Sequence, residues 1–421
     1  MKIISDLHIH SRYSRATSSD LNVANLVKYA HIKGVNLLGT GDFTHPSWLR
    51  EVKDEMEEDG SGVLKTKDGF HFILSAEISS IYSQDGQVRR IHNVVLSPDL
   101  ATVEQVNSAL IRRRVNIESD GRPICGIPSP ELVEMLKEIN PRNEIIPAHI
   151  WTPWFSLFGS KSGFNRIEDC FQDQTKHIHA LETGLSSDPA MNWRLSQLDR
   201  FALVSFSDSH SFWPWRIGRE ATIFELKELS YDNMIKALKT KEGLAETIEV
   251  DPSYGKYHFD GHRDCNISLA PKESEKLRNI CPVCKRELTI GVLHRIEELA
   301  DRNDGHVPEN ARPFRSLVPL SEIISSVMGA NVGSAKVWGE YNKLINAFGS
   351  ELNVLLDAGS EEIKNTTNEK IAAMVLCARN GKMKIKPGYD GVYGEIDTGQ
   401  SRKTSKYENM SKKPQKTLGD F

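Results

Sequence analysis

The segment Asp6-Leu7-His8-Ile9-His10 ends an apolar stretch with histidines at positions i and i+2. On a β-strand these two positions point to the same face, so His8 and His10 can present their imidazoles to one cation, and Asp6 shares that face. Imidazole nitrogen is a common ligand of transition metals. The segment therefore predicts a metal site at the end of a strand.

Candidate ligands recur at or near the ends of later apolar stretches. They are Asp42 and His45, Glu77, His92, His149, and the pair Asp208 and His210. A barrel of parallel strands brings strand ends from distant parts of a sequence to one rim. Each residue alone is more often structural, but a series of imidazoles and carboxylates favours Zn²⁺, Mn²⁺ or Fe²⁺ over Ca²⁺. We therefore expect a centre that holds several metals.

A centre of this kind is suited to the hydrolysis of a phosphoester. Two or three cations neutralise the phosphate, lower the pKa of water to near neutrality and stabilise the leaving oxygen, so no serine or cysteine nucleophile is required. Arg12 and Arg15 follow the first histidine pair and are candidates for contacts to the phosphate or to DNA. The alternative is that they are solvated surface arginines.

The order of these motifs resembles that of the PHP (polymerase and histidinol phosphatase) superfamily over about residues 1–250. The resemblance implies a distorted (β/α)7 barrel with a trinuclear metal centre. It also implies two ligand groups that share one carboxylate: His8, His10, Glu77 and Asp208 in the first, and Glu77, His92 and His149 in the second. We expect Glu77, His149 and Asp208 to be catalytic.

The ligands of a third metal are less defined by this resemblance. His210 would serve that metal, but the chain departs from the usual family pattern, which has Thr-Asp-His after the second strand and a histidine soon after the first. Here the second strand runs into Gly41-Asp42-Phe43-Thr44-His45, and Ser14-Arg15 takes the early position. Asp42 or His45 would then take the place of the family ligands of the third metal. We expect two or three divalent metals (Zn, Mg or Mn) in the centre.

Composition is that of an ordinary cytoplasmic protein. The 421 residues suffice for two or three domains, and 39% hydrophobic with 26% charged residues is typical of soluble globular chains. Neither a membrane segment nor a signal peptide is evident, so we expect a cytoplasmic protein, located with the chromosomal DNA, with no membrane partner. The formal net charge of −4 argues against a nucleic-acid partner, but basic residues gather after about residue 250.

The second pattern is a cluster of cysteine and histidine. His262 and Cys265 are followed by Cys281-Pro282-Val283-Cys284, so two pairs of ligands stand at the same spacing. This arrangement is typical of a structural zinc site, and a redox Cys-x-x-Cys would leave Cys265 unexplained. His258 is an alternative to His262 as the fourth ligand.

Helical periodicity from 319 to 380, with glycines at the turns, predicts a further small helical unit. We therefore divide the chain into a catalytic barrel (1–250), a zinc-binding domain (251–315), a helical DNA-binding domain (316–397) and a flexible tail (398–421).

The whole chain resembles the endonuclease Q family. The resemblance is carried by the PHP motifs, by Tyr257–Cys265, by Pro313–Leu320 and by Lys386–Gly394. It implies a metal-dependent endodeoxyribonuclease that cuts double- or single-stranded DNA 5′ of deoxyuridine, deoxyinosine, deoxyxanthosine or an abasic site. The alternatives are a phosphatase for a small phosphomonoester and a DNA-binding module without catalysis.

Aromatic residues follow two of the metal-bearing strands. Such side chains could line a pocket for an extruded base or wedge into the duplex, although core packing is the alternative. The candidates are Trp151, Trp154 and Phe158 after His149, and Trp213 and Trp215 after His210.

The last residues contain a short pattern, in which Gln415, Leu418 and Phe421 match the Gln-x-x-aliphatic-x-x-aromatic peptide that binds the sliding clamp PCNA. A basic tail that orders on binding suits such a peptide. We therefore expect PCNA as a second partner beside DNA.

Overall fold

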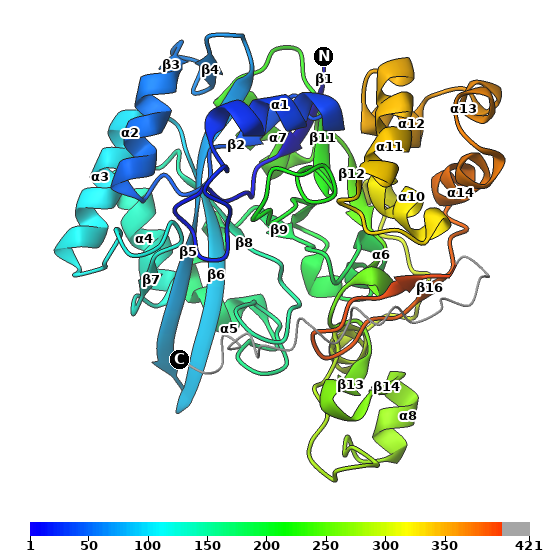
Figure 1. Ribbon diagram of the computed structural model, residues 1–421. Helices are drawn as coiled ribbons and strands as arrows, with labels where there is room; N and C mark the ends of the chain where they lie inside the picture. The colour runs from blue at the N-terminus through cyan, green and yellow to red at the C-terminus, as the bar shows by residue number, and fades with distance from the viewer. Residues whose placement is uncertain (398–421) are drawn as a thin grey trace.

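The computed structural model describes residues 1–397, which form a mixed α/β fold around a central sheet (Figure 1). The sheet has eleven strands in the order β15-β12-β11-β1-β2-β5-β4-β3, with β6 and β7 beside β5 and β8 beside β6. The strands are β1 (Lys2–Asp6), β2 (Leu37–Gly39), β3 (Met56–Glu58), β4 (Leu64–Thr66), β5 (His71–Gln84), β6 (Gln87–Ser97), β7 (Ile124–Cys125), β8 (Glu144–Pro147), β11 (Ala221–Glu225), β12 (Leu244–Val250) and β15 (Phe314–Leu317).

Part of this sheet closes on itself through two further strands. The strands β9 (Ala180–Glu182) and β10 (Ala202–Val204) pair in parallel. A bridge between Ile145 and Ile178 links β8 to the start of β9, and a bridge between Ile9 and Ser209 links the segment after β10 to the segment after β1. The path β1-β2-β5-β6-β8-β9-β10 therefore returns to β1, and the segments after β1 and β10 lie side by side.

The pair β5 and β6 departs from a regular alternation of strands and helices. These two strands form a long antiparallel hairpin, and β6 also pairs antiparallel with β8. Asp85 and Gly86 at the turn have φ of +53° and +73°. An Asp-Gly pair with both φ values positive is the preferred two-residue hairpin turn, which explains why no helix separates these strands.

Helices cover the outside of the sheet. They are α1 (Val23–Lys33), α2 (Pro46–Glu55), α3 (Leu100–Arg112), α4 (Ser129–Ile139), α5 (Ile167–Phe171), α6 (Pro189–Asn192) and α7 (Tyr231–Thr240), with the 3₁₀ helices η1 (Gln172–His177), η2 (Ser196–Leu198) and η3 (Pro252–Tyr254). In α1 the Asn22 side chain accepts from Asn25 N, and Gly34 ends the helix at φ +95° with its N–H bonded to Ala30 O. This is the usual pairing of an Asn N-cap with a left-handed glycine, and it fixes where the chain leaves for β2.

A small element follows β12 and lies apart from the main body in Figure 1. It contains β13 (Asp260–His262), η4 (Arg263–Cys265), β14 (Ile267–Leu269) and α8 (Pro271–Lys276). The next helix, α9 (Val292–Leu299), packs against α6, and its Arg295 bonds to Phe158 O. The next strand, β15, returns to the main sheet and pairs in parallel with β12, from Phe314 beside Thr247 to Leu317 beside Val250. The predicted domain boundary at residue 315 therefore falls inside a strand of the main sheet.

The helices α10 (Leu320–Met328), α11 (Ala335–Phe348), α12 (Glu351–Leu356), α13 (Ser360–Thr366) and α14 (Glu369–Arg379) form a bundle beside the sheet. A last hairpin of β16 (Ile385–Lys386) and β17 (Glu395–Ile396) follows, and Tyr389 between them bridges to Phe259. The described residues contain no helix that combines the length and apolar character needed to cross a bilayer.

Candidate metal centre

Four side chains from three segments of the chain converge on one point. His8 and His10 follow β1, Glu77 lies in β5 and Asp208 follows β10. Glu77 Oε2 lies 3.5 Å from His8 Nε2 and 3.3 Å from His10 Nε2. Asp208 Oδ1 lies 3.6 Å from His8 Nε2 and 3.0 Å from His10 Nε2. All four side chains thus direct one ligand atom to a common centre.

A second group lies against the first and shares Glu77. Its Oε1 lies 2.5 Å from His92 Nδ1 and 3.2 Å from His149 Nε2, and these two nitrogens are 3.3 Å apart. Since Oε2 faces the first group and Oε1 the second, Glu77 is placed to bridge two ions. The structure thus brings together both ligand groups that the resemblance implies.

The spacing and the donor types fit a divalent metal. Four ligand atoms placed tetrahedrally about 2.1 Å from an ion lie about 3.4 Å from one another, which matches the distances in the first group. His8 is 2% exposed, and its Nε2 has no hydrogen-bond partner among residues 1–397. A buried imidazole nitrogen without a partner costs free energy unless a cation occupies the point that it faces.

The remaining nitrogens of the first two histidines are held by carboxylates. His8 Nδ1 lies 2.8 Å from Glu182 Oε2, and His10 Nδ1 lies 3.0 Å from Asp42 Oδ1. Such partners fix the orientation and tautomer of a ligating imidazole. The sequence predicts Asp42 as a possible ligand, but its Oδ2 accepts from Ser11 N, Ser11 Oγ and Ser14 Oγ, so its carboxylate is fully engaged in orienting His10.

The other two candidates for a third metal are placed differently. His45 Nε2 bonds to Glu118 O, and its ring stacks on Tyr13 at 4.4 Å, so His45 belongs to neither ligand group. His210 lies at the edge of the first group, with its ring 4.3 Å from that of His10 and its Nδ1 3.7 Å from Asp208 Oδ1. Of the two, only His210 faces the centre.

Three residues at this centre have a left-handed backbone. Asp42, His149 and Asp208 have φ of +47°, +30° and +46°, in the left-handed region that non-glycine residues seldom adopt. Each follows the end of a strand, where the chain must turn sharply. Strain of this kind persists only where surrounding structure imposes it, and it gathers at functional sites.

Glu77, His92 and His210 carry the charges of metal ligands, whereas at His8, His10 and His149 burial is outweighed by neighbouring carboxylates, which raise the pKa. Burial would raise the pKa of Glu77, but His92, Arg122 and His8 outweigh it and hold that pKa well below its usual range. Burial lowers the pKa of His92 and of His210 to about 4, so both imidazoles are neutral near pH 7. A carboxylate and neutral imidazoles are the forms that bind metals.

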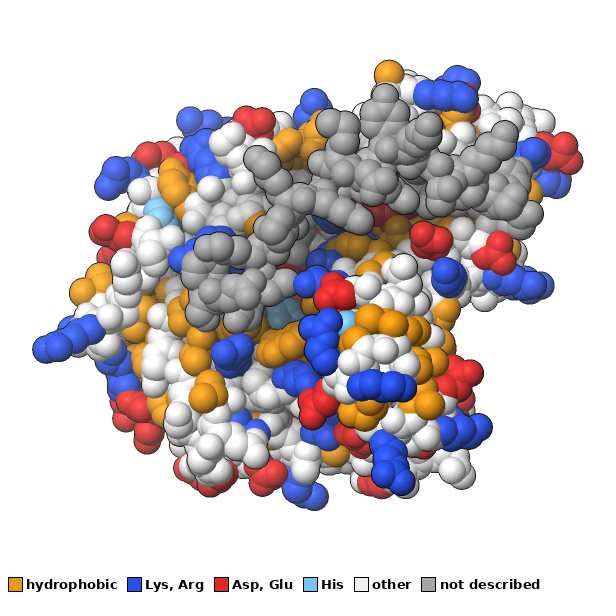
Figure 2. Space-filling view, turned by 60° about the horizontal axis from the view of Figure 1, so that its bottom comes forward, with side chains coloured by type: hydrophobic (Ala, Val, Ile, Leu, Met, Phe, Trp, Pro, Cys, Tyr) orange, Lys and Arg blue, Asp and Glu red, His pale blue; other side chains and the backbone are white. Residues whose placement is uncertain are grey.

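The centre opens to the surface on one side. The side chains of Asp208 and His210 are each 31% exposed, whereas those of His8, His10 and Glu77 are buried. Figure 2 shows histidine surface in a hollow bordered by basic and apolar side chains. A substrate phosphate could therefore reach the ligand groups from the side of Asp208.

Comparisons with solved structures identify the family. The crystal structure of the lesion-specific endonuclease PfuEndoQ from Pyrococcus furiosus matches with a TM-score of 0.84 and 32% identity, over 97% of this chain and 98% of that one. Endonuclease Q in complex with a 27-mer duplex that carries an abasic lesion matches with a TM-score of 0.85 and 34% identity, over 94% and 96%. This chain belongs to the endonuclease Q family. The resemblance seen in the sequence is thereby confirmed, and the chain is a nuclease.

Two further proteins are similar to this chain in sequence. The uncharacterized protein YqxK of Bacillus subtilis is 30% identical over 417 residues, which are 94% of this chain and 99% of YqxK. The uncharacterized protein MJ0043 of Methanocaldococcus jannaschii is 33% identical over 251 residues, which are 58% of this chain and 31% of MJ0043. The match thus spans about a third of MJ0043. Residues 319–382 match the family described as the MJ0043 C-terminal domain.

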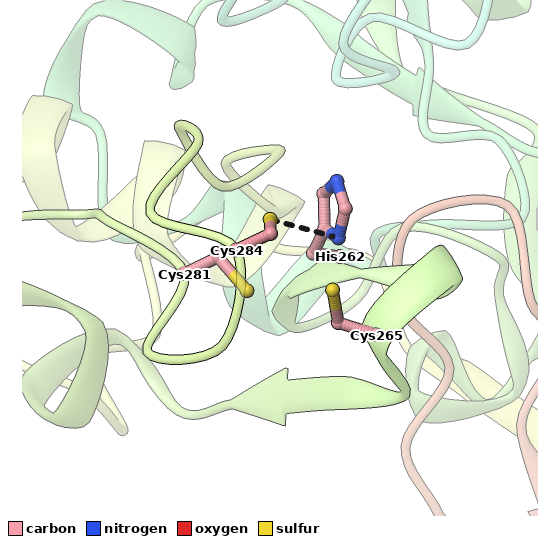
Figure 3. A group of neighbouring side chains, drawn as sticks. All are labelled: His262, Cys265, Cys281 and Cys284. Carbon is pink, nitrogen blue, oxygen red and sulfur yellow. Dashed lines mark hydrogen bonds between the residues drawn. The ribbon is translucent and has the colours of Figure 1, made fainter.

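In this endonuclease Q family member the cysteine and histidine cluster is also assembled (Figure 3). One ligand atom from each of His262, Cys265, Cys281 and Cys284 lies within 4.8 Å of the others, and His262 Nδ1 is 3.8 Å from Cys284 Sγ. Three thiols and one imidazole are a donor set typical of zinc. His258 lies outside this group and is buried with its ring stacked on Phe259.

The two halves of this cluster are built alike. The residue after each second ligand is left-handed, Asn266 at φ +52° after Cys265 and Lys285 at φ +62° after Cys284. Cys281 N bonds to Arg286 O, and Lys285 N bonds back to Cys281 O. Backbone bonds to Arg286 lower the pKa of the Cys284 thiol to about 6, which favours the thiolate that binds zinc.

Two of the five aromatic candidates pack inside the protein instead of lining an open pocket. Trp151 and Phe158 are buried, with rings 4.9 Å apart, and Trp151 Nε1 donates to Asn192 Oδ1. Their proposed contact with a lesion is therefore not supported, because both rings are buried in the hydrophobic core.

The remaining aromatic candidates are partly exposed. Trp213 and Trp215 stack at 5.1 Å and contact Trp338 of α11 at 5.5 and 5.7 Å, so they join the sheet to the helical bundle. Trp154 lies 6.0 Å from Tyr257. Trp154, like Trp213 and Trp215, is half-buried.

Two of the basic candidates pair away from the ligand groups. Arg12 Nη2 lies 2.6 Å from Glu51 Oε1, and Arg15 Nε lies 3.3 Å from Asp120 Oδ2. Their charges are therefore directed to carboxylates outside the centre. The clamp-binding candidates Gln415, Leu418 and Phe421 lie outside the described residues.

Sequence reasoning missed two residues at the centre. Arg122 Nη1 lies 3.0 Å from Glu77 Oε2, although Arg122 is in a loop with no motif. The Phe155 ring lies 4.7 Å from that of His92, and Phe155 has φ of +61°. Only the fold brings either residue to the metal ligands.

Proposed function

We propose that this protein is a metal-dependent DNA repair endonuclease that hydrolyses the phosphodiester bond 5′ of a deaminated base or an abasic site. Deoxyuridine, deoxyinosine and deoxyxanthosine are the deaminated nucleosides that we propose as targets. The observation that carries the proposal is the pair of ligand groups joined through Glu77 in a chain of the endonuclease Q family. The duplex with an abasic lesion bound by the related structure supports DNA as the partner.

The ligand residues have two roles in the proposed reaction: some would bind the metal ions, and others would orient those ligands. His8, His10, Glu77 and Asp208 would hold one divalent ion, and Glu77, His92 and His149 a second. When bound, such ions supply a nucleophile at neutral pH and neutralise the phosphate. Glu182 and Asp42 would keep the two imidazoles aimed at the first ion. In the reaction a water oxygen forms a bond to phosphorus, one P–O bond of the backbone breaks, and the leaving oxygen takes up a proton.

The parts outside the barrel have supporting roles in this proposal. We propose that residues 1–250 form a PHP-type catalytic barrel, extended by β15, and that one zinc ion braces residues 251–313 through His262, Cys265, Cys281 and Cys284. Residues 316–397 would contact DNA beside the barrel, and residues 398–421 would carry the PCNA-binding peptide.

End-labelled duplexes that each carry one deoxyuridine, one deoxyinosine, one abasic site or no lesion test this function with Mg²⁺ or Mn²⁺. A single nick 5′ of the lesion is expected, and none in the undamaged duplex. Asp208→Asn should abolish nicking because it weakens a ligand of the first ion, whereas Asp232→Asn should not, since Asp232 lies on the exposed surface in an ion pair with Arg142. Phosphate release from a simple phosphomonoester without nicking would instead indicate a phosphatase.

A further inference from the structure

Arg122 is the basic residue that reaches the metal ligands. Its Nη1 lies 3.0 Å from Glu77 Oε2, the oxygen that also faces His8 and His10. Its side chain is 16% exposed. Among residues 1–397, no other lysine or arginine forms an ion pair with a residue of either ligand group. Arg122 therefore stands between the buried bridging carboxylate and the open side of the centre.

The loop that carries Arg122 is held closely against the same ligands. Asp120 Oδ1 accepts from Arg122 N and from Arg15 N, and Gly121 N donates to Tyr13 O. A Cβ on Gly121 would lie 2.2 Å from Asp42 Oδ2, so only glycine fits where the loop passes the carboxylate that orients His10. The loop is thus preorganised, and Arg15 acts through Asp120 to position Arg122.

The carboxylates that attract Arg122 are Glu77, Asp208 and Asp120, and bound metals would compete with it for the first two. A guanidinium does not lose its proton in a protein. Two divalent cations would carry more positive charge than the two carboxylates of the ligand groups, Glu77 and Asp208, can neutralise. A guanidinium beside them is then repelled unless an anion joins the centre. A guanidinium carries five N–H donors, so Arg122 can keep the contact of Nη1 with Glu77 and donate to a further acceptor.

We infer that Arg122 binds the phosphate of the substrate and donates from its guanidinium to a non-bridging oxygen. The ions would contact the same phosphate. This inference rests on the proposed function and names the residue through which that site recognises its phosphodiester. Guanidinium donors suit phosphate because two parallel N–H groups match two oxygens. The contact strengthens as negative charge accumulates on the phosphate in the transition state, so it contributes to the rate as well as to binding.

The test compares Arg122→Gln, Arg122→Lys and Arg122→Ala with the full-length protein. We expect kcat on lesion DNA to fall by about 10²- to 10³-fold in Arg122→Gln, as when one preorganised donor is removed from a charged transition state. Arg122→Lys should retain more activity than Arg122→Gln because it keeps the charge. Arg142→Gln is the matched control, since Arg142 pairs with Asp232 on the exposed surface.

Three readouts separate phosphate binding from a structural role. Added guanidinium ion should restore part of the activity of Arg122→Ala but not that of Asp208→Asn. Metal content, measured by mass spectrometry, should be unchanged in Arg122→Gln. Binding to lesion DNA in Ca²⁺ should lose about one unit of its salt slope in the same variant. Loss of metal, with no rescue and an unchanged salt slope, would overturn the inference and leave Arg122 as a brace for Glu77.

Hydrolysis of bis(4-nitrophenyl) phosphate distinguishes this inference from the proposed substrate. If the wild-type protein leaves lesion DNA intact but hydrolyses this diester, the proposed DNA substrate fails, and loss of diester turnover in Arg122→Gln still supports phosphate binding. If the wild-type protein nicks lesion DNA and Arg122→Gln nicks it equally fast, the inference about Arg122 fails and the proposed function stands.

Discussion

Replacing Lys33 by methionine should destabilise the protein, because it removes the cation of a buried ion pair between α1 and the helical bundle. Lys33 lies in the last turn of α1, and its side chain is 1% exposed. Its Nζ donates to Glu351 Oε1 at 2.7 Å and to Pro214 O at 2.8 Å. Glu351, in α12, also accepts from Tyr341 OH and Leu320 N. Both oxygens of this carboxylate thus bond within the protein interior.

The size of the effect follows from what the variant leaves behind. Removing one partner of a buried ion pair costs about 3–5 kcal/mol, because the other charge stays buried without compensation. Glu351 would keep two hydrogen bonds and could take up a proton, so we expect a loss of about 3 kcal/mol, at the lower end. The double variant Lys33→Met with Glu351→Gln removes both charges and should lie within about 1 kcal/mol of the wild-type protein.

The assay is urea denaturation of the wild type, of Lys33→Met, of Glu351→Gln and of the double variant. The four free energies of unfolding give the coupling energy between Lys33 and Glu351. Lys53→Met is the matched control, since Lys53 pairs with Glu104 on the surface and should change the free energy of unfolding by less than about 0.5 kcal/mol. The reasoning would be refuted if Lys33→Met were no more destabilising than Lys53→Met. It would also be refuted if the double variant lost the sum of both single losses.

Three other predictions follow from the sites. Glu182→Ala should weaken metal binding by about 10- to 100-fold, because His8 loses the acceptor that orients its ring; a chelator competition titration measures this, and equal affinity would argue against the role. Cys281→Ser should lower the zinc content by one ion per chain in elemental analysis, and full retention of zinc would exclude Cys281 as a ligand. Burial raises the pKa of Glu249 from 4.5 to about 8, so the folded state holds a proton that the unfolded state loses, and stability should fall as pH rises across this range. In thermal melts from pH 5 to 9, Glu249→Gln should flatten this dependence, and an equally steep fall would contradict it.

Local sequence pattern by itself determined much of the site. Polar residues at the ends of apolar stretches indicated His8, His10, His149 and Asp208, because parallel strands deliver their ends to one rim. Glu77 and His92 instead lie within the antiparallel pair β5 and β6. The cysteine and histidine cluster was evident for a similar reason, since each of its two pairs spans one short turn that is followed by a left-handed residue, Asn266 or Lys285. The Asp85-Gly86 pair likewise has the residue types of a hairpin turn, although a regular β/α barrel would place a helix after that strand.

Tertiary structure alone decided which atoms face the metals and which residues support them. Asp42 has the type and position of a ligand, yet the hydroxyl and amide donors of Ser11 and Ser14 turn its carboxylate toward His10. The contact of Arg122 with Glu77 and that of Lys33 with Glu351 join residues 45 and 318 positions apart. Spacing along the chain carries no signal for such pairs, because a long-range contact depends on how whole strands and helices pack. Local periodicity indicates only which face of one element is buried.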